Sequence, residues 1–267
     1  MPWPNMADPE PPVTNGPSAG ALSPFLLSVV MPAYNEAAVI EVTLHALMAT
    51  LSRQSFEWEI LVVNDASRDR TEEILRRIEQ SDSRLRHVNN EGRHGYGHAV
   101  RCGLAQFRGD AVIVAMADGS DAPDDLVQYA VKLREGYQCA FGMRFGPGSD
   151  VRGYPIVKRI ANRIGNRLIA LLVGQKYSDF TNGFKGFHRS VVEDLMQPLV
   201  SGEFNLTIEM SLKAVLGGAT YAVVPNSWVE RSAGSSKFRL FSLSGLYLMT
   251  IVYCLIDARL KRSGATR

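Results

Sequence analysis

Short apolar runs alternate with amphipathic stretches from residue 25 onward. Apolar runs predict a buried β-strand at residues 25–31 and further strands at 59–63 and 111–116, and short strands are also expected at 85–88 and 138–142. The stretches between them have helical periodicity and predict helices that end near residues 51, 80 and 107. Because strands that alternate with helices are typical of parallel βαβ units, the sequence predicts an α/β fold with a mostly parallel sheet.

Polar side chains gather directly after three of these predicted strands. Ligands bind parallel sheets beyond the carboxyl ends of the strands, where such side chains meet. Aspartate, serine and asparagine are also preferred at helix N-caps, which is the alternative for any one cluster alone. Three clusters at one edge of one sheet predict a ligand site. They are Asn35 and Glu36; Asp65, Ser67 and Asp69; and Asp118, Ser120 and Asp121.

Composition narrows the class of protein. Apolar residues make up 46% of the chain and charged residues 21%, as in folded globular proteins. A net charge of +2 gives no reason to expect a nucleic-acid partner. The cysteines Cys102, Cys139 and Cys254 lack metal-ligand spacing, so they are expected to be buried and reduced. Residues 1–24 hold seven prolines and no signal-peptide pattern, which predicts a disordered tail.

Several motifs occur in an order that resembles glycosyltransferase family 2, in particular the polyprenyl-phosphate sugar synthases of the dolichol-phosphate mannose synthase type. Pro32 to Glu36 is similar to P-x-Y-N-E, Val63 to Asp69 to V-D-D-x-S-x-D, and Ser178 to Phe184 to S-D-x-T-x-G-F. The blocks at residues 90–103, 203–210 and 229–237 complete the resemblance. It implies a single GT-A-like Rossmann-type domain over residues 25–236, followed by a membrane-associating segment at 237–267.

The resemblance implies a nucleotide-sugar donor. It assigns the donor site to these residues: Pro32, Tyr34, Glu36, Asp65, Ser67 and Asp118. Asp118 matches the last aspartate of the family's D-x-D motif, which binds Mg²⁺ or Mn²⁺. Met116 occupies the first position of that motif, and a thioether is a poor ligand for a hard cation. Asp118 is therefore expected to share the metal with Ser120, Asp121, donor phosphates and water.

The acceptor implied by the resemblance is a polyprenyl phosphate. Such a phosphomonoester is already ionised at neutral pH, so the reaction needs no general base. A hydroxyl acceptor would need one, and Glu193-Asp194 lacks the Q-x-x-R-W tail typical of such enzymes. The expected reaction is inverting hexosyl transfer, with GDP-mannose as the first donor hypothesis and UDP-glucose as the second. The alternatives are a hydroxyl-glycosylating member of the family and a non-catalytic sugar-nucleotide or lipid-binding protein.

Basic residues are expected to bind the phosphates of donor and acceptor, because arginine suits bidentate phosphate contacts. Asp118, Arg144 and Arg231 are the expected catalytic residues by resemblance. The acceptor phosphate is assigned to Ser178, Thr181, Asn182, Arg231 and Lys237.

Two segments predict a membrane surface at the cytoplasmic face. Residues 155–174 form a predicted helix in which an arginine stripe adjoins an apolar stripe, a pattern that suits an anionic lipid surface. The alternative is a helix whose apolar stripe faces the core. Residues 240–256 carry no charge and are expected to lie in the membrane interface or insert shallowly, with contact to a second copy as the alternative. The stripes are Arg159, Arg163 and Arg167, and Ile156, Ile160, Ile164, Leu168 and Leu171.

Overall fold

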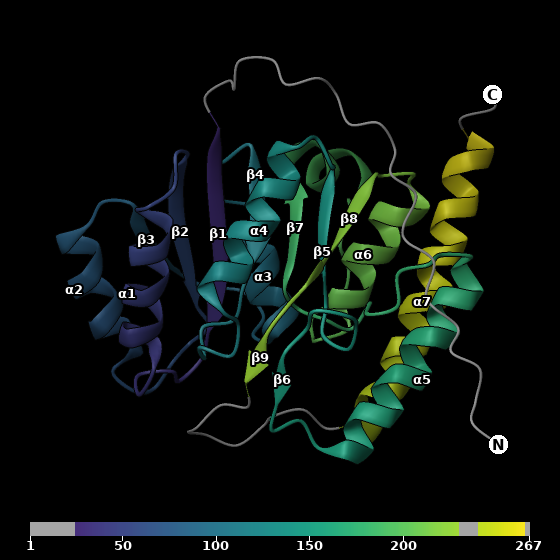
Figure 1. The fold of residues 1–267 in the computed structure, drawn as a ribbon, viewed down its shortest axis with the longest axis horizontal. Helices are drawn as coiled ribbons and strands as arrows, with labels where there is room; N and C mark the ends of the chain where they lie inside the picture. The colour runs from purple at the N-terminus through teal and green to yellow at the C-terminus, as the bar shows by residue number, and fades with distance from the viewer. Residues whose placement is uncertain (1–24, 230–239, 265–267) are drawn as a thin grey trace.

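The computed structural model describes residues 25–229 and 240–264, and its main feature is a seven-stranded sheet. The order of the strands across the sheet is β3-β2-β1-β4-β7-β5-β8 (Figure 1). The bounds are β1 Leu26–Ala33, β2 Glu57–Asn64, β3 Leu85–Asn89, β4 Ala111–Val114, β5 Cys139–Met143, β7 Lys185–His188 and β8 Tyr221–Pro225. A small second sheet pairs β6 Val151–Arg152 with β9 Trp228–Val229.

The first half of the sheet is parallel, because helices return the chain after each strand. β1 pairs in parallel with β2 and with β4, and β2 pairs in parallel with β3. The connecting helices are α1 Ile40–Leu51, α2 Thr71–Ser81 and α3 Tyr96–Leu104, and α4 Pro123–Arg134 follows β4. All five predicted strands and the predicted helices between them are confirmed, with shifts of a few residues at their ends.

Successive residues of a strand point to opposite faces of the sheet, and both faces are covered. Val29 and Met31 of β1 belong to the core cluster under α1, α2 and α4. Val30, between them, belongs to the cluster that includes α3 and α6 Leu206–Leu216. Burial on both faces explains why the predicted strands read as continuous apolar runs.

The second half departs from simple βαβ order. β7 lies between β4 and β5 and is antiparallel to both, while β5 and β8 are parallel. The sequence did not predict β7 or α6. The ten residues from Leu206 to Val215 of α6 are all buried, so this helix lacks the polar face that amphipathic periodicity needs.

Two helices lie at the same end of the molecule in Figure 1: α5 Ile156–Val173 and α7 Leu240–Gly264. Helix α5 ends at Gly174, which has the left-handed conformation common at helix C-termini. Helix α7 packs on α6 through Ile251 and Cys254, and the Asn205 amide donates to the Thr250 hydroxyl. Among the described helices, none combines the length and apolar character needed to cross a bilayer.

Some predictions concern parts of the chain that the structure does not describe. The N-terminal tail at residues 1–24 lies outside the described residues, as do Arg231 and Lys237. Of the three cysteines, Cys139 and Cys254 are buried as predicted. Cys102 is only half-buried, so the prediction of burial is wrong for it; its sulfur accepts a hydrogen bond from the side-chain amide of Gln106, an exposed residue.

Candidate active site

The loops after β1 and β2 are joined by hydrogen bonds. The Asn35 amide donates to the Ser67 hydroxyl at 3.0 Å, and the Arg68 amide donates to the Asn35 side-chain oxygen at 2.7 Å. Asn35 and Ala66 both have positive φ, of 56° and 57°, a conformation that costs free energy for residues with a side chain. Residues other than glycine that hold such strained conformations cluster at functional sites. The two hydrogen bonds join the loops into one rigid rim of the site.

Asp69 strengthens the same rim. Its carboxylate accepts hydrogen bonds from the Ala37 amide and from the amide and hydroxyl of Thr71. Burial would raise the pKa of Asp69, but the hydrogen bonds from Thr71 and Ala37 lower it overall. Ser67 and Asp69 therefore hold the loops in place through contacts within the protein.

The Asp65 carboxylate joins the end of β2 to the start of α3. It accepts hydrogen bonds from the Asn90 side-chain amide at 2.7 Å and the Gly95 amide at 2.8 Å, and it lies 3.1 Å from Nδ1 of His94. Asp65 is buried, whereas Tyr34, another predicted donor residue, is 38% exposed. Pro32 and Glu36 are half-buried at the same edge. The predicted donor residues therefore lie together at the carboxyl ends of β1 and β2.

The glycines around Tyr96 allow a close approach to another loop. A Cβ atom added to Gly97 would lie 2.6 Å from the carbonyl carbon of Gly202, and one added to Gly95 would lie 2.8 Å from the Gly202 oxygen. Gly95 also has a φ of 132°, which residues with a side chain rarely adopt. The lack of side chains at Gly95 and Gly97 thus lets residues 202 and 203 pack against the start of α3, at the site.

The Asp118 turn follows β4. One Asp118 oxygen accepts the Ser120 amide at 3.0 Å, and one Asp121 oxygen accepts the Met116 amide at 3.0 Å. Burial raises the pKa of Asp121 to about 7; the Met116 hydrogen bond lowers it and the Asp118 charge raises it further. Met116 thus contributes its backbone amide to this turn, at the position where the motif would have a carboxylate.

The side chains of the Asp118 turn are of the chemical type that binds divalent cations. Asp118, Asp121 and Ser120 offer hard oxygen atoms, and the Asp118 charge contributes to the raised pKa of Asp121. Among the described residues, no group of three or more carboxylate, histidine or cysteine side chains is placed to enclose a metal by itself. Such a sparse set fits Mg²⁺ or Mn²⁺, because Mg²⁺ typically takes one or two carboxylates and completes its shell with water and substrate phosphates.

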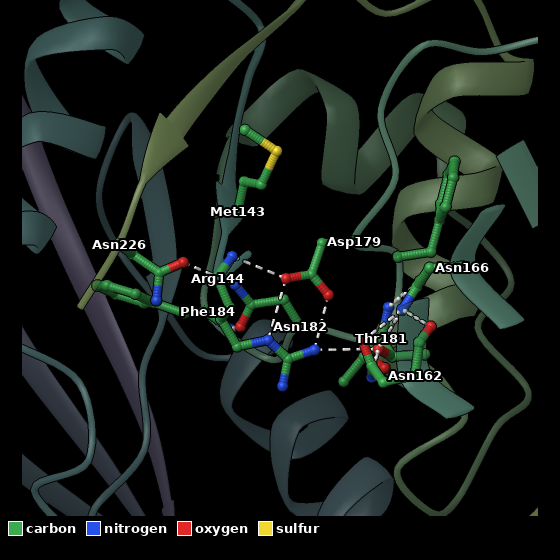
Figure 2. A network of polar contacts seen from close by, with 12 residues as sticks. Met143, Arg144, Asn162, Asn166, Asp179, Thr181, Asn182, Phe184 and Asn226 are labelled. Carbon is green, nitrogen blue, oxygen red and sulfur yellow. Dashed lines mark hydrogen bonds and ion pairs between the residues drawn. The ribbon is translucent and has the colours of Figure 1, made fainter. Parts of the chain in front are cut away.

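Arg144, directly after β5, forms the centre of a second polar network (Figure 2). Its guanidinium donates to the two Asp179 oxygens at 3.0 and 2.6 Å and to the Thr181 hydroxyl at 3.0 Å. The Thr181 hydroxyl also accepts from the side-chain amides of Asn162 and Asn166, both on α5. Burial would lower the pKa of Arg144, but Asp179 raises it overall, so the guanidinium stays charged.

The neighbouring motif residues are tied into the same network. Asn182 is buried; its amide nitrogen donates to Asn226, and its oxygen accepts the Phe184 amide (Figure 2). The sequence analysis named Arg144, Thr181 and Asn182 but missed Asp179 as the partner of Arg144. It also missed Asn162 and Asn166. Two asparagines four residues apart within an otherwise arginine-rich and apolar helix were the available signal.

Lys185 lies beneath this network at the start of β7. Its ammonium donates to the Phe180 carbonyl at 3.2 Å and to the Tyr177 hydroxyl at 3.3 Å. The Tyr177 hydroxyl in turn donates to the Asp179 carbonyl at 2.5 Å. Burial lowers the pKa of Lys185 to about 7, with a partial opposing effect from Asp179.

A pocket of about 480 Å³ lies between the Arg144 network and α5. Arg163, Arg167 and Lys176 contribute cations to its lining. Apolar side chains, among them Phe145 and Leu171, form other parts of the wall. Ser178, one of the predicted acceptor residues, also lines it.

The family model described as glycosyl transferase family 2 matches residues 28–196. The chain belongs to this family. It is 31% identical over 234 residues to glycosyltransferase AglD of Haloferax volcanii, a match that covers 86% of the chain and 37% of that protein. It is 29% identical over 214 residues to polyprenol monophosphomannose synthase of Mycolicibacterium smegmatis, covering 78% of the chain and 79% of the synthase. These matches identify a glycosyltransferase rather than a non-catalytic binding protein.

Solved structures share the fold of this family 2 glycosyltransferase. A mycobacterial protein superposes with a TM-score of 0.68 at 19% identity, covering 86% of this chain and 74% of that one. Glucosyl-3-phosphoglycerate synthase from Mycobacterium tuberculosis, in complex with Mn²⁺, UDP and glucosyl-3-phosphoglycerate, superposes with a TM-score of 0.62 at 22% identity, covering 88% and 80%. The enzyme therefore has a GT-A-like α/β fold, as predicted.

Proposed function

We propose that this glycosyltransferase transfers a hexosyl group, with inversion, from a nucleotide-sugar to a polyprenyl phosphate. The observation that carries the proposal is the pocket beside Arg144, which combines the cations of Arg163, Arg167 and Lys176 with apolar walls. A lipid phosphate is an amphiphilic anion and needs both kinds of contact. The name of the relative from Mycolicibacterium smegmatis, a polyprenol monophosphomannose synthase, supports the same acceptor class.

The acceptor itself supplies the nucleophile in this reaction. A phosphomonoester oxygen attacks the anomeric carbon of the sugar, the bond from that carbon to the nucleotide phosphate breaks, and a nucleoside diphosphate leaves. Because the acceptor is already ionised near neutral pH, no side chain has to remove its proton. The charge of Arg144 is balanced by Asp179, so the positive potential of the acceptor pocket comes from Arg163, Arg167 and Lys176.

The donor side of the proposal uses the joined loops after β1 and β2. Glu36 and Asp65 lie at the uncharged nucleoside end, since a carboxylate repels phosphate and accepts hydrogen bonds from base or ribose. A divalent cation held by Asp118, with Ser120 and Asp121, would neutralise charge on the departing diphosphate. GDP-mannose is the first donor proposed and UDP-glucose the second. Outside the described residues, Arg231 and Lys237 are proposed to bind phosphate.

The membrane surface enters the proposal through α5. Support comes from the exposure of its apolar stripe: Ile156 and Leu171 are 75% and 79% exposed, whereas Asn166 and Ile169 are buried. The arginines beside this stripe complement an anionic bilayer. We place the enzyme at the cytoplasmic face, with α5 lying in the interface and bringing the pocket to the lipid. Helix α7 exposes Leu248 and Met249 in the same region and is proposed to contribute.

A donor panel tests the proposal. Purified enzyme is incubated with Mg²⁺ or Mn²⁺, a short polyprenyl phosphate and radiolabelled GDP-mannose, UDP-glucose or another UDP-hexose, and the product is extracted into organic solvent. The expected result is acid-labile label in the organic phase with one donor, and none when polyprenol replaces its phosphate. Label that appears only on a water-soluble hydroxyl acceptor would favour the hydroxyl-glycosylating alternative.

A further inference from the structure

The Tyr96 hydroxyl is buried and has no hydrogen-bond partner among the described residues. Tyr96 is the first residue of α3, and its ring stacks on Phe204 with centroids 4.2 Å apart and planes 9° apart. The stacking fixes the ring, so the hydroxyl is held in one place. A buried hydroxyl without a hydrogen-bond partner destabilises the folded state, so its presence here requires an explanation.

The Tyr96 hydroxyl lies between the two halves of the site, the Asp118 turn and the Ser178–Phe184 motif. A Cβ atom added to Gly183 would lie 3.1 Å from the Tyr96 oxygen, so the S-D-F-T-N-G-F motif passes directly beside it. Burial foremost, and then the nearby groups Asp121, Tyr247 and Asp118, raise the pKa of the phenol well above its usual range. At neutral pH the group is therefore a neutral O–H, able to donate.

Met116 makes this place suitable for an anion. The same added Cβ atom on Gly183 would lie 3.9 Å from the Met116 sulfur, so the thioether and the phenol both face the Gly183 backbone. A carboxylate at position 116 would add a third negative charge to those of Asp118 and Asp121, whereas a thioether adds none. The chain thus presents an unpaired neutral donor beside an uncharged side chain, between the Asp118 turn and the Ser178–Phe184 motif.

We infer that the Tyr96 hydroxyl is a substrate-binding group that donates a hydrogen bond to a phosphate oxygen of the nucleotide-sugar or of the lipid phosphate. This inference rests on the proposed function, because it requires phosphate-bearing substrates at the Asp118 turn. A side chain at position 183 would crowd this hydroxyl, because its Cβ atom would lie 3.1 Å from the Tyr96 oxygen.

The test compares Tyr96→Phe with Tyr253→Phe. The first variant keeps the stacked ring and removes only the unpaired hydroxyl. The second removes a hydroxyl that accepts a hydrogen bond from Lys213 at the contact of α6 with α7, away from the motifs. Thermal unfolding is measured without ligand, and affinities are measured separately for a nucleoside diphosphate with Mg²⁺ and for a short polyprenyl phosphate.

Tyr96→Phe is expected to unfold at the wild-type temperature or above it, yet to bind one of the two compounds about tenfold more weakly, the effect of losing one charge-assisted hydrogen bond. The weakened compound identifies which phosphate the hydroxyl contacts. Tyr253→Phe is expected to lose stability and keep both affinities. Wild-type affinity of Tyr96→Phe for both compounds, a loss of stability equal to that of the control, or absence of binding by the wild type would each overturn the inference.

The inference and the proposed function can fail separately. If the wild type glycosylates no polyprenyl phosphate but Tyr96→Phe weakens nucleoside diphosphate binding, the proposed acceptor is wrong and the role of Tyr96 stands. If polyprenyl phosphate is glycosylated equally well by both proteins, with equal affinities, the role of Tyr96 is wrong and the acceptor stands.

Discussion

The Asp179 carboxylate binds the Arg144 guanidinium with both of its oxygens, at 2.6 and 3.0 Å. Both side chains are largely buried, with 3% of the Asp179 side chain and 11% of the Arg144 side chain exposed. The guanidinium is therefore held in a fixed orientation, and its charge is balanced within the protein. The pairing also gives Asp179, whose contact with Arg144 was not predicted, a structural role beside the proposed acceptor pocket.

Asp179→Asn is expected to destabilise the enzyme, because Arg144 would remain buried without a counter-charge. Removal of one partner from a buried ion pair costs about 3–5 kcal/mol, to be measured as a lower midpoint of urea unfolding. Asp150→Asn is the matched control, since Asp150 pairs with Arg152 at the surface and 54% of its side chain is exposed. Equal, small effects of the two substitutions would contradict a structural role for the Arg144–Asp179 pair.

Asp118→Asn is expected to abolish metal-dependent transfer and to preserve the fold. The asparagine oxygen can still accept the Ser120 amide, but the substitution removes the negative charge that attracts a divalent cation. Transfer is measured by organic extraction across a titration of Mg²⁺ and Mn²⁺. Asp124→Asn, on the exposed start of α4, should leave transfer unchanged. Full activity of Asp118→Asn would remove the metal role.

Lys185 predicts a pH dependence of stability. Its folded-state pKa of about 7 is below the ordinary value, which lies near 10.4. Between these pH values the unfolded chain binds more protons than the folded one, so the free energy of unfolding rises with pH. The penalty for burying the ammonium is fully present below pH 7 and declines as pH approaches 10.

Lys185→Met lacks this titration. Its stability relative to wild type is therefore expected to be highest at pH 6 and to fall as pH rises toward 10, as measured by urea unfolding at several pH values. Lys132→Met, on the partly exposed face of α4, is the matched control. A difference between Lys185→Met and wild type that does not change with pH would show that Lys185 does not titrate in this range.

Replacing Ile160 and Leu168 on α5 with serine is expected to weaken binding to anionic vesicles. Each side chain is 55% exposed, so the fold loses little, whereas burial of such side chains in lipid contributes about 1.5 kcal/mol or more apiece. Sedimentation with vesicles should show a loss of about tenfold or more. Val42→Ser on α1, where Val42 is 74% exposed, is the control. Unchanged vesicle binding of the α5 variant would contradict the membrane role.

The sequence was sufficient for the elements that obey simple periodicity. Strands β1, β2 and β4 read as apolar runs because both faces of the sheet are covered there. The polar loops after β1 and β2 are joined by hydrogen bonds, and the loop after β4 follows the strand that pairs in parallel with β1. Helix α6 was not predicted because ten of its eleven residues are buried, which leaves no amphipathic pattern. Strand β7 was not predicted because it is only four residues long, Lys185–His188. Lys185 is a charged residue of a kind that buried strands rarely contain, and its partners, Phe180 and Tyr177, cannot be predicted from the sequence.

The sequence indicates candidate site residues but not the contacts between their side chains. Asp65 and Asp118 lie where the motifs indicate. The motif around Thr181 could not reveal that asparagines of α5, fifteen and nineteen residues earlier, hold its hydroxyl. Such contacts depend on the packing of α5 against the sheet, which no local pattern encodes.

The reversed direction of β7 decides how the Ser178–Phe184 motif reaches the other motifs. In a parallel sheet, the loop that follows each strand carries the functional residues. A crossover helix must then return the chain to the opposite edge before the next strand begins. Since β7 runs the opposite way, the chain enters this strand at the ligand edge, and the residues ahead of it are already there. One antiparallel strand thus lets the enzyme draw its proposed acceptor side from an incoming segment, so insertions just before β7 are expected to alter acceptor choice and to leave the proposed donor loops intact.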